Sequence, residues 1–278
     1  MNQPAPAPTP PKLPVSLAAN PKLSSWLKIS SNGQATVSPG KVEIGQGIVT
    51  ALAQIAADEL DIDLSRVQMI RASTAASPNE GVTSGSLSIQ QSGRALRHAC
   101  AEVRQIFLQQ AAERLGVDID ALDIQDGTIS GPGNVTTSYW ELTEEVSLDR
   151  DATPGVTPKI ASRRALAGNS IQRIDIPDKV LGRPRFIHDQ ALAGMLHGRV
   201  LRPENARARL IELNEDGARA VAGIVAIVRD GSFAGVVSET EHDAEAALNA
   251  LRKGATWSDG DPLPDENDLA SFLKAQTT

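Results

Sequence analysis

Hydrophobic positions recur with two different periods in the first half of the chain. Residues 26–30 and 34–38 alternate between apolar and polar on either side of an Asn-Gly turn, which predicts a β-hairpin. Residues 48–60 and 96–115 instead repeat their apolar positions every three to four residues, which predicts two amphipathic helices. A glycine follows the second helical pattern and marks its end. These patterns together predict strands and helices that share a core.

The second half of the chain carries shorter patterns. Runs typical of strands occupy residues 194–203 and 206–214, and residues 222–239 contain two apolar runs joined through Asp230-Gly231. A helical pattern covers residues 244–251. Because strands and helices do not alternate regularly, we expect an α+β fold.

Composition divides the chain into five predicted parts. The first residues are rich in proline and alanine, which favours an extended arm, and a later stretch rich in Pro, Asp and Thr indicates a linker. The predicted boundaries are 1–22 for the arm, 23–147 for the first domain, 148–170 for the linker, 171–262 for the second domain and 263–278 for the tail.

Length, charge and cysteine content exclude several classes of protein. With 278 residues and 41% hydrophobic content the chain is long enough to bury a core. Its net charge of −7 argues against binding nucleic acid, and its single cysteine, Cys100, excludes an internal disulfide and is expected in the core. No secretory signal or membrane span is visible, so we expect a cytoplasmic protein that reaches a membrane only through a partner.

Two glycine-flanked polar loops each precede a helical pattern. One is Gly45-Gln46-Gly47, and the other is the "TSGSLS" stretch at residues 83–88. Backbone N–H groups at a helix start, together with small hydroxyl side chains, suit a phosphate or another anion. Tight turns with ordinary serine and threonine caps explain the same residues, and the spacing alone leaves both interpretations open. No Walker loop, zinc-protease motif or dinucleotide fingerprint accompanies the loops.

Two blocks of sequence resemble a known protein family. The segments "KVEIGQGIVTALAQIAADEL" and "STAASPNEGVTSGSLSIQQSGRALRHACAEVR" resemble the cofactor-binding segment of the large subunits of molybdenum hydroxylases, the xanthine dehydrogenase and aldehyde oxidase family. A later block, "QRIDIPDKVLGRPRFIHDQALAGMLHGRVLRPENARARL", resembles the start of that family's α/β hammerhead domain. The order of the blocks is similar to the branch of the isoquinoline 1-oxidoreductase β subunit and nicotinate dehydrogenase large subunits. The resemblance implies a molybdopterin-binding segment followed by a hammerhead-like domain.

The resemblance implies roles for residues of both loops. It implies that Gln46 is a catalytic residue that hydrogen-bonds an oxo ligand of molybdenum, while Gly45 and Gly47 allow the backbone to approach. A carboxamide suits this role because it donates a hydrogen bond without carrying a titrating charge. No protein side chain is implied to bind the metal directly. The residues implied to bind the pyranopterin and its diphosphate are Thr83, Ser84, Gly85, Ser86 and Ser88.

The resemblance also implies a cofactor and a reaction. The expected cofactor is molybdenum with molybdopterin cytosine dinucleotide, shared with a partner chain. The family hydroxylates an N-heteroaromatic ring or an aldehyde with water as the oxygen source. Electrons would leave through [2Fe-2S] clusters on a small partner subunit, and a cytochrome is one candidate for their acceptor.

One essential feature of the family is missing from the sequence. Family members carry a glutamate general base in a G-x-G-E context, which this chain lacks; Glu43 and Glu80 lie near the loops, but we interpret them as solvent-facing or as loop hydrogen-bonding groups. We therefore expect a split piece of a large subunit, natural or artificially truncated, that is inactive alone. A second large-subunit chain would carry the catalytic glutamate. The alternative is a non-catalytic scaffold protein that keeps the fold without metal.

Overall fold

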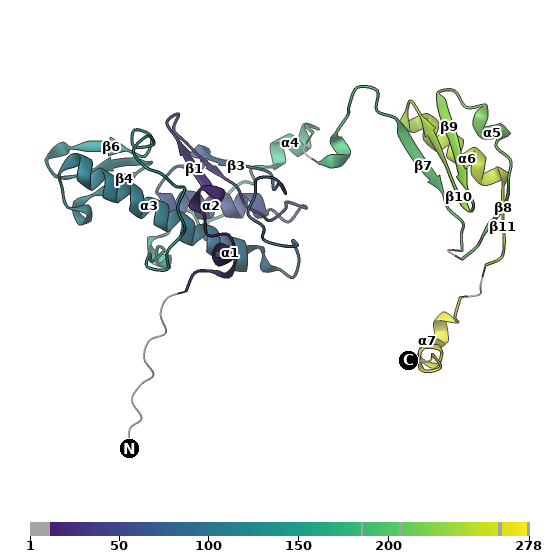
Figure 1. Cartoon of the computed structure of the whole chain (residues 1–278), viewed down its shortest axis with the longest axis horizontal. Helices are drawn as coiled ribbons and strands as arrows, with labels where there is room; N and C mark the ends of the chain where they lie inside the picture. Colours follow the sequence, from purple (N-terminus) through teal and green to yellow (C-terminus); the bar gives the residue numbers. More distant parts are fainter. Residues whose placement is uncertain (1–11, 185, 206, 261–262, 277–278) are drawn as a thin grey trace, which may run out of the picture. The chain divides into compact units, whose positions relative to one another are not determined.

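The chain divides into two compact units, Met1–Arg185 and Phe186–Thr278 (Figure 1). The computed structural model describes residues 12–184, 186–205, 207–260 and 263–276. Each unit buries its own hydrophobic cluster, so each has the core that a separate domain requires.

The predicted hairpin opens the sheet of the first unit. Strand β1 (Leu27–Ser30) pairs antiparallel with β2 (Gln34–Val37), and Gly33 at the turn has a φ of 87°. Strand β3 (Val67–Met69) pairs with β2 in parallel. Alternate side chains of β1 and β2 are buried, because one face of the hairpin covers the core as the period of two requires.

Both predicted helices of the first unit are confirmed. Helix α2 (Ile48–Leu60) packs against α3 (Arg94–Leu115), and a π-helix at Ser88–Gly93 precedes α3. Helix α3 ends at Gly116, whose φ of 66° suits glycine. Cys100 on α3 is fully buried, which confirms its place in the core, and burial raises the pKa of its thiol far above the ordinary value.

Smaller elements complete the first unit. An antiparallel sheet has the order β4 (Asp123–Gln125), β5 (Thr128–Ser130) and β6 (Thr136–Ser138). The 3-10 helices of this unit are Leu23–Ser25, Leu64–Arg66, Ile119–Ala121, Pro132–Asn134 and Ala161–Arg163.

Part of the expected N-terminal arm is folded. Helix α1 (Val15–Ala19) contacts α3, and its Leu17 is fully buried in the core of the unit. The prediction of an extended arm does not hold for these residues, because the buried leucine attaches them to the core. Residues 1–11 of the arm lie outside the described part of the chain.

Residues 148–184 run along the first unit. The carboxylate of Asp58 on α2 accepts hydrogen bonds from the backbone N–H groups of Ala165 and Leu166, more than 100 residues further along the chain. Helix α4 (Ile176–Val180) follows. The structure thus groups residues 171–184 with the first unit, although the sequence pattern placed them at the start of the second domain.

The second unit contains two small sheets and a helix that covers the first of them. Its first sheet has the order β7 (His197–Leu201), β10 (Phe233–Ser238) and β9 (Ile224–Asp230), all antiparallel. Helix α6 (Glu241–Gly254) buries its apolar side against this sheet. The remaining elements are β8 (Leu210–Leu213) paired with β11 (Ala255–Trp257), the helices α5 (Asp216–Arg219) and α7 (Leu269–Lys274), and 3-10 turns at Ile187–Asp189 and Glu266–Asp268.

Helices and strands are mixed in both units, which agrees with the predicted α+β class. Within the described ranges, no helix is both long and apolar enough to cross a membrane.

Candidate functional site

The Gly45-Gln46-Gly47 turn is held by a carboxylate of its own loop. Gly45 and Gly47 have φ angles of 109° and 81°, a region that favours glycine, and Gly47 directly precedes α2. Oε1 of Glu43 accepts hydrogen bonds from the backbone N of Gly45 (2.8 Å) and of Gly47 (3.0 Å), and Oε2 accepts one from Val49 (3.2 Å). Because Glu43 occupies the start of α2, this helix end does not serve as the anion site that the sequence pattern allowed.

The hydrogen bonds of the loop favour the ionised form of Glu43. Burial raises the pKa of its carboxyl group, but the backbone hydrogen bonds from Gly47, Val49 and Gly45 outweigh burial and hold the pKa below the ordinary value of 4.5. These three hydrogen bonds confirm the interpretation of Glu43 as a loop hydrogen-bonding residue. Its side chain is only 10% exposed.

The side chain of Gln46 folds back over its own loop. Its Oε1 accepts a hydrogen bond from the backbone N of Ile44 at 2.7 Å, and its Nε2 donates to the carbonyl of Val42 at 2.9 Å. A carboxamide has two N–H donors, so one donor of Nε2 remains for another acceptor. Gln46 as a whole is an exposed residue.

A row of hydrogen bonds joins the glycine turn to the second polar loop. The backbone N of Gly40 donates to Oε2 of Glu80 at 2.8 Å, and the backbone N of Val42 donates to Oγ1 of Thr83 at 3.0 Å. Between them, Nζ of the buried Lys41 donates to the carbonyl of Glu80 at 2.7 Å. The two loops are therefore fixed side by side, although 40 residues separate them in sequence.

Glu80 anchors the second loop to the π-helix. Its side chain is buried, and Oε2 also accepts a hydrogen bond from Oγ of Ser92 at 2.7 Å. This confirms its interpretation as a loop hydrogen-bonding group. Position 40, beside the Glu80 side chain, requires glycine because a Cβ there would lie 2.2 Å from the carbonyl oxygen of Pro78.

The second loop leads into an unusual helix start. Ser86 has a φ of 58°, and the backbone N of Leu87 donates to the carbonyl of Ser84 at 3.3 Å. The π-helix Ser88–Gly93 follows, and a Cβ at Gly93 would lie 3.1 Å from Cδ1 of Ile55 on α2. Single π-helical turns occur frequently at functional sites, so this feature supports a role for the loop in binding.

The two loops enclose one depression of about 360 Å³. Seven of the eight predicted site residues line it, and the eighth, Gly45, instead turns its carbonyl to Arg173. None of the residues that line the depression is acidic. Within the described part of the chain, the hydroxyls of Ser84, Ser86 and Ser88 make no hydrogen bond to protein. The predicted residues that line the depression are Gln46, Gly47, Thr83, Ser84, Gly85, Ser86 and Ser88. The apolar walls are Ile44, Ile48, Ala51 and Ile89.

Arg173 contacts the glycine turn and was not identified from the sequence. Its Nη1 donates to the carbonyl of Gly45 at 3.0 Å, and Nη2 lies 3.6 Å from Oε1 of Glu43. Its guanidinium also binds both carboxylate oxygens of the fully buried Asp175, at 3.0 and 2.7 Å, while Lys179 lies 2.5 Å from the same carboxylate. The hydrogen bond from Arg173 holds the pKa of Asp175 far below its usual value, despite burial. The Arg-x-Asp-x-x-x-Lys spacing was visible in the sequence, but its contact with a turn 128 residues earlier was not.

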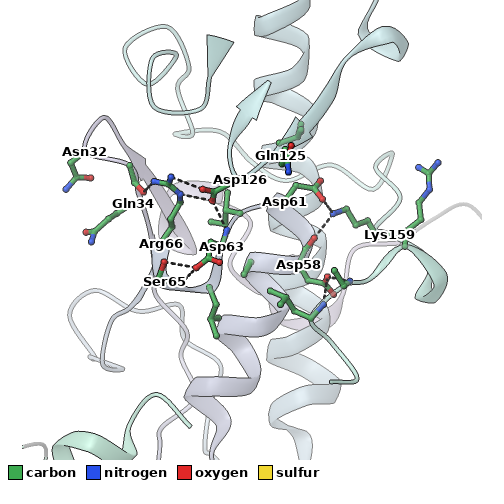
Figure 2. A pocket seen from close by; sticks show the side chains of 18 residues that line it. Asn32, Gln34, Asp58, Asp61, Asp63, Ser65, Arg66, Gln125, Asp126 and Lys159 are labelled. Carbon is green, nitrogen blue, oxygen red and sulfur yellow. Dashed lines mark hydrogen bonds and ion pairs between the residues drawn. The ribbon is translucent and has the colours of Figure 1, made fainter. Parts of the chain in front are cut away.

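A larger cavity, of about 790 Å³, lies elsewhere on the first unit (Figure 2). Two ion pairs lie in it: Arg66 binds both carboxylate oxygens of Asp126, at 2.7 and 2.8 Å, and Lys159 pairs with Asp61. Among the described residues, the donors to the carboxylate of Asp58 are all backbone N–H groups. Sequence reasoning assigned no function to these residues, and their mutual pairing accounts for them structurally.

Comparisons with known proteins identify a family and several relatives of the chain. The molybdopterin cofactor-binding domain family matches residues 9–162. A nicotinate dehydrogenase subunit of Pseudomonas putida is 35% identical over 280 residues, which cover 96% of this chain and 23% of that protein. A membrane-bound aldehyde dehydrogenase of Gluconacetobacter polyoxogenes, named for pyrroloquinoline quinone, is 28% identical over 258 residues, which cover 88% of this chain and 33% of that protein. The β subunit of isoquinoline 1-oxidoreductase of Brevundimonas diminuta is 26% identical over 239 residues, which cover 72% of this chain and 31% of that protein.

The class of protein follows from the family match: the first unit contains a molybdopterin cofactor-binding domain. The chain belongs to the molybdopterin cofactor-binding domain family and corresponds to a portion of a molybdenum hydroxylase large subunit. This confirms the resemblance seen in the sequence. The chain spans only 23% to 33% of the length of these three relatives.

The residues of the depression fit a molybdopterin group. Serine hydroxyls and the N–H groups at the start of the π-helix suit phosphate oxygens, and glycine at position 85 leaves the backbone accessible. No lining carboxylate repels an anion, since Glu43 is turned inward to the start of α2. The carboxamide of Gln46 adds a neutral donor at the other side of the depression.

Proposed function

We propose that the chain binds the molybdenum cofactor of a multi-subunit dehydrogenase in the depression between its two glycine-flanked loops. The observation that carries this proposal is that one depression collects Gln46 from the first loop and the hydroxyls of the second loop. When bound, the cofactor would supply the two-electron oxidation of a substrate C–H, with water as the source of oxygen. The substrate class is an N-heteroaromatic ring or an aldehyde.

In this proposal each loop has a separate task. The remaining N–H of Gln46 donates to an acceptor atom of the bound group, and its neutrality avoids a competing charge beside the reacting atoms. The hydroxyls of Ser84, Ser86 and Ser88 bind the pyranopterin phosphates. A cytosine dinucleotide form of the cofactor would carry a diphosphate, which matches several small donors better than a single charged side chain.

A second polypeptide segment is proposed to cover the depression. Large apolar side chains around it are exposed: Ile44 by 70%, Val82 by 80%, and Val42 and Ile89 by 47% each. Exposed apolar side chains that surround a polar site are typical of a surface that packs against another domain. We assign that surface to a chain with the catalytic glutamate, and electron transfer to a small [2Fe-2S] subunit with a cytochrome as one candidate acceptor.

The second unit has a structural role in the proposal. Its antiparallel sheet and covering helix are compatible with the hammerhead-like domain expected for residues 171–262. The segment 23–147 would be the cofactor-binding portion, and the described residues of the tail, 263–276, would follow the second unit.

The proposal is tested by purifying the chain natively from its host. The co-eluting chains are identified by mass spectrometry, and the same fraction is assayed for molybdenum, iron and pyrroloquinoline quinone. We expect a second large chain with a G-x-G-E motif, a small cysteine-rich chain and near-stoichiometric molybdenum.

Two results would overturn the proposal. A metal-free chain alone, or one bound to unrelated proteins, would support the scaffold alternative. A stoichiometric quinone without molybdenum would assign the depression to a different cofactor.

A further inference from the structure

We propose that Arg173 is the positioning residue of the Gly45-Gln46-Gly47 turn. Held by Asp175, its guanidinium fixes the carbonyl of Gly45 and the carboxylate of Glu43, and thereby sets the place of Gln46 beside the hydroxyl loop. Its effect on turnover rests on the proposed function, whereas the positioning itself is a property of the chain without cofactor.

The turn needs a contact from outside its own loop. Two glycines with positive φ give the backbone access to conformations that other residues avoid. The hydrogen bonds of Glu43 and Gln46 tie the loop to itself and to the first turn of α2. Arg173 instead comes from a distant segment, and this segment is attached to α2 by the backbone N of Ile174, which donates to Oγ1 of the buried Thr50 at 3.1 Å.

The charges around Arg173 alternate in sign. They follow the order Glu43, Arg173, Asp175, Lys179. Arg173 lies 3.6 Å from Glu43 and 2.7 Å from Asp175, and Asp175 lies 2.5 Å from Lys179. The bidentate pair with Asp175 sets the plane and the direction of the guanidinium. A lysine at position 173 would keep the charge but could not bind both carboxylate oxygens and the Gly45 carbonyl in one plane.

Arg173 acts through the turn and not on the bound group. It is not among the residues that line the depression. It packs against the outer side of the turn instead, where a Cβ added at Gly47 would lie 3.5 Å from its Nε. Its loss should therefore loosen the turn without removing any donor from the depression.

The test measures amide hydrogen exchange on the full chain without cofactor. The variants are Arg173→Gln and Arg173→Lys. The matched control is Arg183→Gln, which removes an exposed ion pair with Asp178 close to α4. For Arg173→Gln we expect exchange in residues 42–49 to become at least about tenfold faster, with a smaller increase for Arg173→Lys. Exchange in residues 98–108 of α3 should stay unchanged in all three variants.

Two outcomes would overturn the proposal. One is exchange in residues 42–49 that matches wild type in both Arg173 variants. The other is equal acceleration in α3 and in the turn for both variants, because Arg173 would then stabilise the whole unit and position nothing in particular. Faster exchange confined to the turn supports the proposal whether or not the purified complex contains molybdenum, so this test and the test of the cofactor can fail separately.

Discussion

Two cavities of the first unit, the larger cavity around Arg66 and the smaller depression around Gln46, differ in what their polar groups bind. In the larger cavity four charged side chains bind one another, in the pairs Arg66–Asp126 and Lys159–Asp61 (Figure 2). In the smaller one, the hydroxyls of Ser84, Ser86 and Ser88 have no protein partner among the described residues. The larger cavity has more charge and twice the volume, about 790 Å³ against about 360 Å³.

Under the proposed function, the difference means that unused hydrogen-bonding capacity, and not volume or charge, marks the binding site. Paired charges have already met their partners, so a ligand would have to displace them and recover the cost of separating them. Hydroxyl and amide donors that face solvent lose only water when a ligand arrives. The larger cavity is therefore expected to serve stability, and the smaller one to bind a ligand.

The largest effect on stability is expected at Asp58 in the larger cavity. Its carboxylate accepts hydrogen bonds from three consecutive backbone N–H groups, at 2.7, 3.1 and 3.3 Å. Asp58→Ala leaves these groups without partners and should lower the free energy of unfolding by about 3 kcal/mol. Urea denaturation followed by circular dichroism measures this, with the exposed Gln125→Ala of the same cavity as control. Equal midpoints for the two variants would contradict the structural role.

In contrast to Asp58, Gln46 should affect turnover strongly and the free energy of unfolding only slightly. We expect Gln46→Ala to reduce turnover of the assembled complex about a hundredfold, because a donor beside the reacting atoms is lost. The free energy of unfolding should fall by less than about 1 kcal/mol, since the residue is exposed. Steady-state kinetics with a heteroaromatic substrate measure the loss, and Gln34→Ala in the larger cavity is the control. Wild-type turnover in Gln46→Ala would contradict the role proposed for Gln46 in the site.

A pair of serine variants tests the comparison directly. Ser84→Ala should weaken cofactor retention about three- to tenfold and leave the melting temperature unchanged, because its hydroxyl has no protein partner to lose. Ser65→Ala should lower the melting temperature and leave cofactor retention unchanged, since Oγ of Ser65 donates to Asp63 at 2.6 Å. Molybdenum content after dialysis and thermal melts measure both. Equal molybdenum content and equal melting temperatures for the two variants would contradict the proposed difference between the cavities.

The smallest effect is expected from the pH dependence of the Arg66–Asp126 pair. The hydrogen bond from Arg66 lowers the pKa of Asp126 below its ordinary value of 3.8, so the pair stabilises the folded chain above that pH. This contribution is lost as the pH falls through the lowered pKa. Because the Asp126 side chain is 43% exposed, Asp126→Asn should cost less than about 1 kcal/mol at pH 7. Urea denaturation at pH 7 and at pH 3 should show the gap from wild type narrowing at the lower pH; a widening gap would contradict the assignment.

Local patterns predicted much of the first unit. The β1–β2 hairpin, the helices α2 and α3 and the glycine end of α3 all follow from residues close in sequence, because turn and helix geometry depend on near neighbours. The two glycine-flanked loops were recognised for the same reason. The helix α1 and the attachment of residues 148–184 were not, since a buried leucine and a carboxylate on α2 hold them through distant contacts.

The sequence by itself determined the family, the two loops and the residue types that are proposed to face a ligand. Only the tertiary structure decided that the loops share one depression, that Glu43 closes the start of α2 and that Arg173 clamps the glycine turn. The physical reason is distance along the chain. Hydrogen bonds and ion pairs act over a few ångströms in space, and a linear sequence does not show which residues 40 or 128 positions apart come within that range.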